Sequence, residues 1–346
     1  MLEIITTCAF GVEDLLEDEL TALGLQSLVV VDGSVSGSGD WSAVWRANMG
    51  VRLGRRVLVQ LGVWPASTLD ELRAGAAELV TRDPIVAGLL DAEGTVGVYA
   101  TCSDSKIDYA GAASKAALQG VLDAQRALTG ECSLGVARDP ELPLRLRIYK
   151  NQATLLLDTS GADLDDRPKR GPRPVRATMA AALAEVAGPR DVLFDPWPEE
   201  SDAIQEWLDR AADRGPNVSR ERWPFLGLPG HDADAFRVAW TASRGTGRGA
   251  RVITTWEEAA RVRGGLLLGC PPADWPEERW RELGVRLKKD LRGWRAVLLA
   301  RGLGTGRGLR LRPKIRRQVR DGKLFGMILG LDLNEVPPAR PHRSER

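Results

Sequence analysis

The sequence predicts an α/β protein with two small α/β units followed by a larger, Rossmann-like unit. Segments with helical periodicity alternate with short β-type runs along nearly the whole chain. The 346 residues are too many for one ordinary core and fit two or three domains. A segment rich in proline and arginine separates the small units from the large one. We therefore expect domains at 1–62, 63–160 and 177–334, a basic linker at 161–176 and a disordered tail at 335–346.

The composition excludes several classes of protein. Lys and Arg total 48 against 47 Asp and Glu, so a globally polybasic nucleic-acid binder is excluded, although local basic patches are not. Apolar residues make up 43% of the chain and charged residues 27%, which argues against extensive disorder. No apolar run approaches the ~18 residues that a membrane helix needs, and the first residues lack the basic region of a secretory signal. We expect a cytoplasmic protein without a membrane partner.

Cysteine and histidine usage argues against metal chemistry. The four cysteines lie far apart, without a Cys-x-x-Cys pair, and are expected to be reduced. Only two histidines are present, so a His-based zinc site or a Ser-His-Asp triad is not expected. The sequence therefore predicts no metal site, and it leaves the oligomeric state open.

The first unit has the pattern of a ferredoxin-like half. A β-type run at 2–7 precedes apolar residues at helical spacing over 12–23, and Gly24 stands where a C-cap glycine belongs. A strand follows at 27–31, and then a Gly/Ser-rich turn. Asp40 can cap a helix over 42–48, after which the chain returns as a strand over 51–61.

The second unit repeats the alternation of helices and strands. A helix is expected at 70–80, a strand at 95–101, and a second helix at 110–128 whose inward residues are mostly small. Two alternating strands follow, at 144–149 and 153–159. Lys150-Asn151-Gln152 joins them in what its length and composition predict to be a hairpin.

The third unit has the alternating elements of a doubly wound sheet. The expected strands lie at 192–194, 251–255, 265–268 and 296–300, and a last pair forms a hairpin around Asp321-Gly322. Helices are expected at 179–186, 203–212 and 277–291. Eight of the eleven tryptophans fall from Trp197 onward.

Five segments of the chain have the residues of one known family, in the order in which that family has them. They are residues 9–20, 106–117, 155–161 and 173–183, and Arg222-Trp223-Pro224-Phe225. Together they resemble the THUMP-domain RNA methyltransferases, most closely the bacterial 23S rRNA guanine-N2 methyltransferases. The resemblance implies a ferredoxin-like unit, a THUMP domain and a class I methyltransferase domain. It also implies structured RNA (rRNA or tRNA) as partner and S-adenosylmethionine as cofactor.

The first catalytic motif departs from the family pattern. In the family, the first strand of the sheet ends in Asp-Pro, and a Gly-x-Gly loop follows whose glycines let the backbone approach S-adenosylmethionine. Here Asp195-Pro196 is in place, but Glu199 and Ser201 stand at the two glycine positions. Even ~2–3 kcal/mol of steric and repulsive cost weakens binding roughly 30- to 150-fold. We expect these four residues to be a vestigial cofactor site.

The second catalytic motif departs as well. Family members have Asn-Pro-Pro-Tyr after the fourth strand, where the Asn side chain and a Pro carbonyl hold the reacting amine and the aromatic ring stacks on the base. Here the residues are Cys270-Pro271-Pro272-Ala273. A thiol does not replace the amide acceptor, and alanine has no ring. Losses of this kind cost about 2.7–4 and 1–3 kcal/mol, so these residues are expected to be a vestigial catalytic site.

The middle of the third unit is short for the family fold. Only 251–255 is a good strand candidate between the first and the fourth strand. The second strand, whose acidic end would hold the cofactor ribose, is expected to be missing or rebuilt. Glu257 and Glu258 could imitate that acidic end, but a capped helix start is the favoured interpretation.

Basic residues concentrate in the linker and near the last hairpin. Between Arg301 and Lys323 lie nine Lys or Arg residues against one acid. They are interpreted either as a solvated strand edge or as a phosphate-facing surface. The predicted RNA contacts are Lys106, Lys115, Arg167, Lys169, Arg170, Arg173, Arg176, Lys314, Arg316 and Arg317.

The sequence therefore predicts an RNA-binding THUMP protein whose truncated methyltransferase domain has lost cofactor binding and catalysis. Two alternatives stay open: an active S-adenosylmethionine-dependent RNA methyltransferase, and a protein-interaction module without RNA binding. In the favoured case no cofactor is expected, and tryptophans fill the cofactor's volume. A pocket smaller than ~300 Å³ should then remain beside Asp195. The tryptophans expected there are Trp197, Trp207, Trp223 and Trp240.

Overall fold

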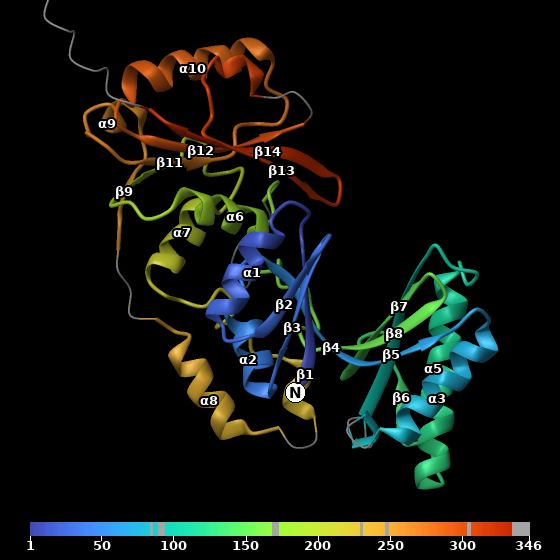
Figure 1. The fold of residues 1–346 in the computed structure, drawn as a ribbon. Helices are drawn as coiled ribbons and strands as arrows, with labels where there is room; N and C mark the ends of the chain where they lie inside the picture. Colours follow the sequence, from blue (N-terminus) through green and yellow to red (C-terminus); the bar gives the residue numbers. More distant parts are fainter. Residues whose placement is uncertain are drawn as a thin grey trace, which may run out of the picture. The chain divides into compact units, whose positions relative to one another are not determined.

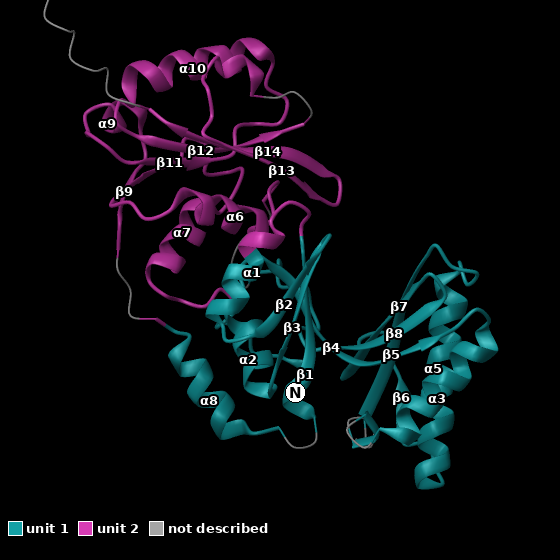
Figure 2. Ribbon diagram, in the orientation of Figure 1, with its two compact units in different colours: residues 1–8, 16–168, 217–244 teal, residues 9–15, 169–216, 245–346 magenta. Residues whose placement is uncertain are grey.

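The computed structural model describes residues 1–83, 86–88, 94–167, 173–228, 231–245, 249–302 and 306–333 (Figure 1). Two compact units make up the chain (Figure 2). Unit 1 comprises residues 1–8, 16–168 and 217–244, and unit 2 comprises residues 9–15, 169–216 and 245–346. The predicted disordered tail lies outside the described residues. None of the described helices is long and apolar enough to span a lipid bilayer.

Unit 1 is built on one eight-stranded sheet. Its strands, in sheet order, are β2 (Gln26–Val31), β3 (Ser34–Gly39), β1 (Leu2–Cys8), β4 (Gly54–Pro65), β8 (Gln152–Asp158), β7 (Leu142–Tyr149), β5 (Gly94–Ser103) and β6 (Leu134–Val136). The long strand β4 pairs with β1 through its first half and with β8 through its second half. The first two predicted domains therefore share one sheet.

The N-terminal part of this sheet carries helices α1 (Glu13–Ala22) and α2 (Trp41–Gly50). Asp40 caps α2 as predicted, because its Oδ1 accepts a hydrogen bond of 2.9 Å from the Ala43 amide. The Gly/Ser segment expected to be a turn is instead strand β3. Its small residues are required by close packing: a Cβ on Gly39 would lie 2.6 Å from the Cβ of Ala43.

The second part of the sheet is covered by helices α3 (Leu69–Arg82) and α5 (Ala110–Thr129). The small face predicted for α5 lets the two helices approach closely, since a Cβ on Gly120 would lie 2.3 Å from the carbonyl oxygen of Arg73. The predicted hairpin between β7 and β8 is confirmed. Lys150 and Asn151 form its two-residue loop with φ of 49° and 59°, the left-handed values of a type I′ turn.

Residues 217–244, which the sequence places in the third domain, pack in unit 1. They contain η1 (Pro224–Gly227) and α8 (Ala233–Ala242), a helix that the sequence did not predict. Two side chains fasten the segment. The Asn217 amide donates to the Asn48 carbonyl at 3.0 Å, and the Arg220 guanidinium donates to the carbonyl oxygens of Ala162 and Asp163 at 2.9 and 2.7 Å.

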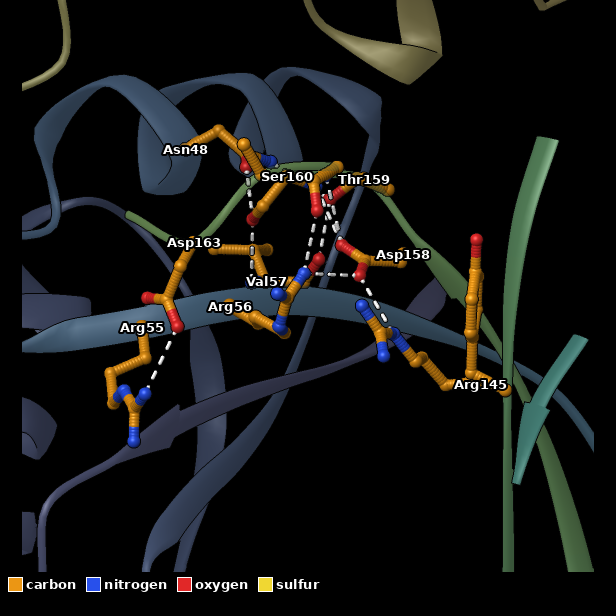
Figure 3. A network of polar contacts seen from close by, with 12 residues as sticks. Asn48, Arg55, Arg56, Val57, Arg145, Asp158, Thr159, Ser160 and Asp163 are labelled. Carbon is orange, nitrogen blue, oxygen red and sulfur yellow. Dashed lines mark hydrogen bonds and ion pairs between the residues drawn. The ribbon is translucent and has the colours of Figure 1, made fainter. Parts of the chain in front are cut away.

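A buried polar network joins β4 to the end of β8 (Figure 3). The Asp158 side chain is fully buried and accepts from Arg56 at 2.6 Å and from Arg145 at 2.9 Å. Its other oxygen accepts from the Ser160 and Gly161 amides at 3.1 and 3.0 Å. Four donors, two of them guanidinium groups, thus surround this buried carboxylate.

Asp158→Ala should lower the free energy of unfolding by about 3–5 kcal/mol, because two guanidinium groups lose a buried partner. Urea titration followed by circular dichroism measures the change. Asp163→Ala is the matched control: it also removes the partner of an arginine, Arg55 at 3.0 Å, but the Asp163 side chain is 29% exposed and that of Arg55 27%. An exposed pair of this kind contributes about 1 kcal/mol or less. Equal losses in the two variants would contradict the assignment of Asp158 as the buried anchor.

Unit 2 contains a six-stranded sheet. Its strands, in sheet order, are β10 (Arg251–Ile253), β9 (Val192–Phe194), β11 (Leu266–Gly269), β12 (Arg295–Arg301), β14 (Leu324–Asp332) and β13 (Ile315–Asp321). The first four are parallel, and β14 runs antiparallel to β12 and β13. The last hairpin is confirmed, with its loop at Gly322-Lys323, one residue later than predicted.

Helices α6 (Ala177–Ala187) and α7 (Ala203–Ala211) lie on one face of this sheet, and α10 (Glu277–Asp290) lies on the other (Figure 1). The short helix α9 (Trp256–Ala259) follows β10, and η2 (Arg307–Leu309) packs against α10. Phe194, Trp280 and Trp294 are among the large side chains buried in the core between the sheet and α10.

Residues 9–15, here called the strap, run beside the edge strand β13. Phe10 and Arg320 exchange two backbone hydrogen bonds of 3.0 Å. Gly11 permits the approach, because its φ is +89° and a Cβ there would lie 2.0 Å from the Gln318 carbonyl oxygen. Arg317 donates to the Gly11 carbonyl at 2.9 Å and to Asp14 at 2.8 Å, which fixes the strap further.

Candidate functional site: a methyltransferase-like strand edge

The predicted vestigial residues meet at the carboxyl ends of β9 and β11, where the ligands of open α/β sheets bind. Asp195 is only 8% exposed, and its Oδ1 accepts from the Trp197 amide at 2.8 Å. Gly269 lies directly against it, since a Cβ there would be 2.4 Å from the same oxygen. The ends of the first and fourth strands therefore touch.

Burial from solvent determines the protonation states of Asp195 and Cys270 at this edge. Burial raises the pKa of Asp195 to about 7, although the Trp197 amide opposes the shift; the nearby charge of Glu199 adds to it. Burial also raises the pKa of the Cys270 thiol to about 12, so that this group is neutral and not a nucleophile. Ser201 is buried with them, whereas Pro196 is half-buried and Glu199 is exposed.

Tryptophan rings cover the strand ends. Trp197 is 7% exposed and meets Trp275 edge to face, with 5.5 Å between ring centres. Trp256 meets Phe194 in the same way at 5.0 Å. Trp207 is buried, and its Nε1 donates to the Gly188 carbonyl at 2.9 Å. Of these rings, Trp197 packs against Gly269 at the end of β11 and Trp256 against Phe194 at the end of β9.

Two of the four tryptophans expected at this edge lie elsewhere. Trp223 stacks on Phe225 with 5.6 Å between ring centres, and Trp240 donates to the Val218 carbonyl at 2.9 Å. Both belong to the segment that folds with unit 1. The expectation that they fill the cofactor's volume is wrong, because position in the sequence does not show with which unit a segment packs.

A hollow of about 260 Å³ remains beside Trp197. It is lined by Trp197, Trp256, Trp275, Arg279, Glu282, Leu283 and Arg286, and Asp195 is not part of its wall. The Arg286 guanidinium stacks on Trp256 at 4.1 Å from the ring centre and thus takes up one aromatic face. The volume lies below the ~300 Å³ from which ligand pockets usually start.

An arginine bridge that sequence reasoning missed closes the two motifs on each other. Arg301, at the end of β12, donates from one nitrogen to Glu200 at 2.7 Å and to the Pro271 carbonyl at 2.8 Å. Its side chain is 10% exposed and that of Glu200 is 16% exposed, so the pair is largely buried. Pro271 is the first proline of the fourth-strand motif. The resemblance implies that a proline carbonyl of this motif accepts a hydrogen bond from the target amine. Here that carbonyl already has a donor.

The second strand of the sheet is present but short. β10 has three residues and pairs with β9 in parallel, where the sequence suggested a missing or rebuilt strand. Thr255 caps α9 by accepting from the Glu258 amide at 3.2 Å, which confirms the capped helix start. Glu258 pairs with Arg251 at 2.7 Å, and the Glu257 side chain is 75% exposed.

The predicted RNA contacts are divided between the two units. In unit 1, Lys106 and Lys115 are exposed. Arg167 is 4% exposed and donates to Asn217 at 2.9 Å and to the Arg52 carbonyl at 2.8 Å. This arginine is a structural residue, and its assignment as a phosphate contact is not supported. Lys169 and Arg170 lie outside the described residues.

The cations of unit 2 are placed differently. Arg173 and Arg176 are exposed and lie 3.2 Å from Asp202 and 3.6 Å from Asp321. On the last hairpin, Lys314 and Arg316 are exposed, whereas Arg317 is turned toward the strap.

Within the part of the chain that the structure describes, no group of three or more His, Cys, Asp and Glu side chains could hold a metal ion.

The fold and the motif positions define a class of protein: an RNA-methyltransferase-like chain with a ferredoxin-like part and a class I methyltransferase-like sheet. Residues 3–58 match the family model of the RlmL ferredoxin-like domain. The chain is 32% identical over 238 residues to "Ribosomal RNA large subunit methyltransferase K/L" of Pseudomonas savastanoi pv. phaseolicola; the match covers 66% of this chain and 31% of that protein. It thus spans about a third of the length of the curated relatives it matches. The resemblance inferred from the sequence is confirmed.

Solved structures agree on the fold. SMU.472, a putative methyltransferase complexed with SAH, matches with a TM-score of 0.83 at 17% identity, over 97% of this chain and 99% of that one. A possible methylase from Clostridium difficile 630 matches with a TM-score of 0.82 at 17% identity, over 98% of this chain and 100% of that one. At such identities the likeness shows the fold alone.

Proposed function

We propose that this protein binds structured RNA, of the rRNA or tRNA kind, in the cytoplasm and that it neither holds S-adenosylmethionine nor transfers methyl groups. The observation that carries the proposal is the Arg301 bridge, which joins Glu200 of the first motif to the Pro271 carbonyl of the second. A cofactor and a target amine would both have to approach these motifs, and here one largely buried guanidinium ties the two motifs together.

The side chains around the bridge support the same proposal. A cofactor carboxylate would meet the exposed Glu199, and the space beyond it is taken by Trp197. The fourth-strand motif offers Cys270 as a buried neutral thiol and Ala273 in place of an aromatic ring. The competing proposal, an active methyltransferase, draws on the names of the curated relatives and on the SAH bound in SMU.472.

Calorimetry with S-adenosylmethionine or SAH up to about 1 mM should show no binding. The double variant Glu199→Gly/Ser201→Gly, which restores both glycine positions, should also show none, because Arg301 and Trp197 stay in place. Wild-type protein should nevertheless bind a folded rRNA fragment or tRNA, more weakly as salt rises. A dissociation constant in the low micromolar range for S-adenosylmethionine or SAH would contradict the proposal and favour the active-enzyme alternative. Absence of RNA binding would leave the interaction module.

A further inference from the structure

One face of β13 displays a row of polar side chains at regular spacing. Lys314, Arg316, Gln318 and Arg320 are exposed, whereas the intervening residues are half-buried or buried. Lys314 precedes the strand but continues its ladder, since its amide donates to the Gly330 carbonyl at 2.8 Å. Alternate residues of a strand lie about 6.8 Å apart, a distance comparable with that between successive phosphates of an extended nucleic-acid strand.

At one end of the row the cation Arg320 lies between two aromatic residues. It is opposite Phe325 of β14 and opposite Phe10 of the strap, and directly opposed residues share a face of the sheet. The Arg320 guanidinium is 5.7 Å from the centre of the Phe10 ring, and Phe10 is 37% exposed. An exposed ring beside a row of cations offers a base a surface on which to stack.

The strap holds this ring in place before any ligand arrives. Phe10 is bonded to β13 on both its amide and its carbonyl. Beyond it, Arg317 bonds to the carboxylate of Asp14 from the opposite face of β13, and this hydrogen bond lowers the pKa of Asp14. The acidic side chain therefore faces away from the row. On the row itself, Lys314 lies 2.7 Å from Asp332, which leaves Arg316 and Arg320 as the stronger phosphate contacts.

We propose that this surface, the β13 face (Phe10, Lys314, Arg316 and Arg320), binds a single-stranded stretch of RNA. The cations follow successive phosphates, and Phe10 stacks on a base at the end of the row. The inference rests on the proposed RNA binding and names the part of the RNA that unit 2 contacts. Charges on an edge strand also prevent pairing with other sheets, but here the strap already covers the edge at Arg320, and that role does not call for an exposed aromatic ring.

Binding of the full chain to a labelled single-stranded oligouridine, measured by fluorescence anisotropy over a salt series, tests the proposal. Arg316→Ala/Arg320→Ala should flatten the slope of log K against log salt by about 1.4, the value for two phosphate contacts on a single strand. Phe10→Leu should weaken binding about fivefold or more at every salt concentration, because one stacked base is lost, and Phe10→Tyr should restore it.

Arg279→Ala/Arg281→Ala is the matched control, since it removes two exposed arginines from α10 of the same unit. Its slope should equal that of the wild type. Wild-type protein that binds folded RNA but not the oligouridine, or an unchanged slope in Arg316→Ala/Arg320→Ala, overturns the β13 face and leaves the proposed function intact. Failure of the wild type to bind either RNA overturns both.

Discussion

Trp197→Ala should lower the free energy of unfolding of unit 2 by about 3–5 kcal/mol, the usual range for truncation of a buried aromatic side chain. Trp197 is 7% exposed, lies in the core cluster with Phe194 and packs on Gly269 and Trp275. In a cofactor-binding loop this position would face a ligand, and truncating it would chiefly affect binding. Here we expect the whole effect to appear in stability.

The loss is measured by chemical denaturation followed by circular dichroism, which does not depend on the indole that is removed. Trp197→Phe is the control, because it keeps an aromatic ring in the same volume and should recover most of the stability. A loss of less than about 1 kcal/mol for Trp197→Ala would be typical of a surface position and would mean that the cleft is open. That result would favour the active-enzyme alternative.

Asp195→Asn should stabilise the protein above pH 7. The folded protein raises the pKa of this carboxyl from 3.8 to about 7, mainly because it is buried. Its protonated form is favoured by folding, so the stability that Asp195 contributes is full below pH 3.8 and is lost as the pH rises to about 7. Above that pH the wild type keeps a buried carboxylate at a cost of up to about 4 kcal/mol, which the neutral amide avoids.

Stability measured from pH 4 to pH 8 should therefore fall more steeply in the wild type than in Asp195→Asn, whose amide oxygen can still accept from the Trp197 amide. Glu199→Gln is the control: it removes the minor charge contribution and leaves the burial, so most of the pH dependence should persist. Identical pH profiles for the wild type and Asp195→Asn would show that this carboxyl is solvated, as in an open site.

Sequence patterns predicted the elements whose cause is local. The apolar runs that became β9, β11 and β12 are buried strands, and Asp40 caps its helix because capping involves residues three apart. Strand β3 was missed because its Ser and Gly residues have no strand propensity of their own; close packing against α2 selects them. Helix α8 was also missed, and none of its residues is fully buried.

The sequence predicted which residues make up the site, but it did not predict the contact between Arg301 and Glu200. The replaced glycines and the Cys-Pro-Pro-Ala motif are visible in the sequence, whereas Glu200 and Arg301 are 101 positions apart and only the fold brings them together. Charge alone was also a poor guide to exposure. Arg167 looked like a member of a basic linker and is instead a buried donor within unit 1.

Strand β4 belongs to both parts of the unit 1 sheet, and this has a consequence for whether the two parts can be separated. This strand of 12 residues gives its first half to one neighbour, β1, and its second half to another, β8. A break between the part of β4 that pairs with β1 and the part that pairs with β8 would leave each fragment with an unpaired sheet edge, prone to mispairing. The two parts are thus not interchangeable modules on a tether. Separating them leaves β4 with only one of its two partner strands.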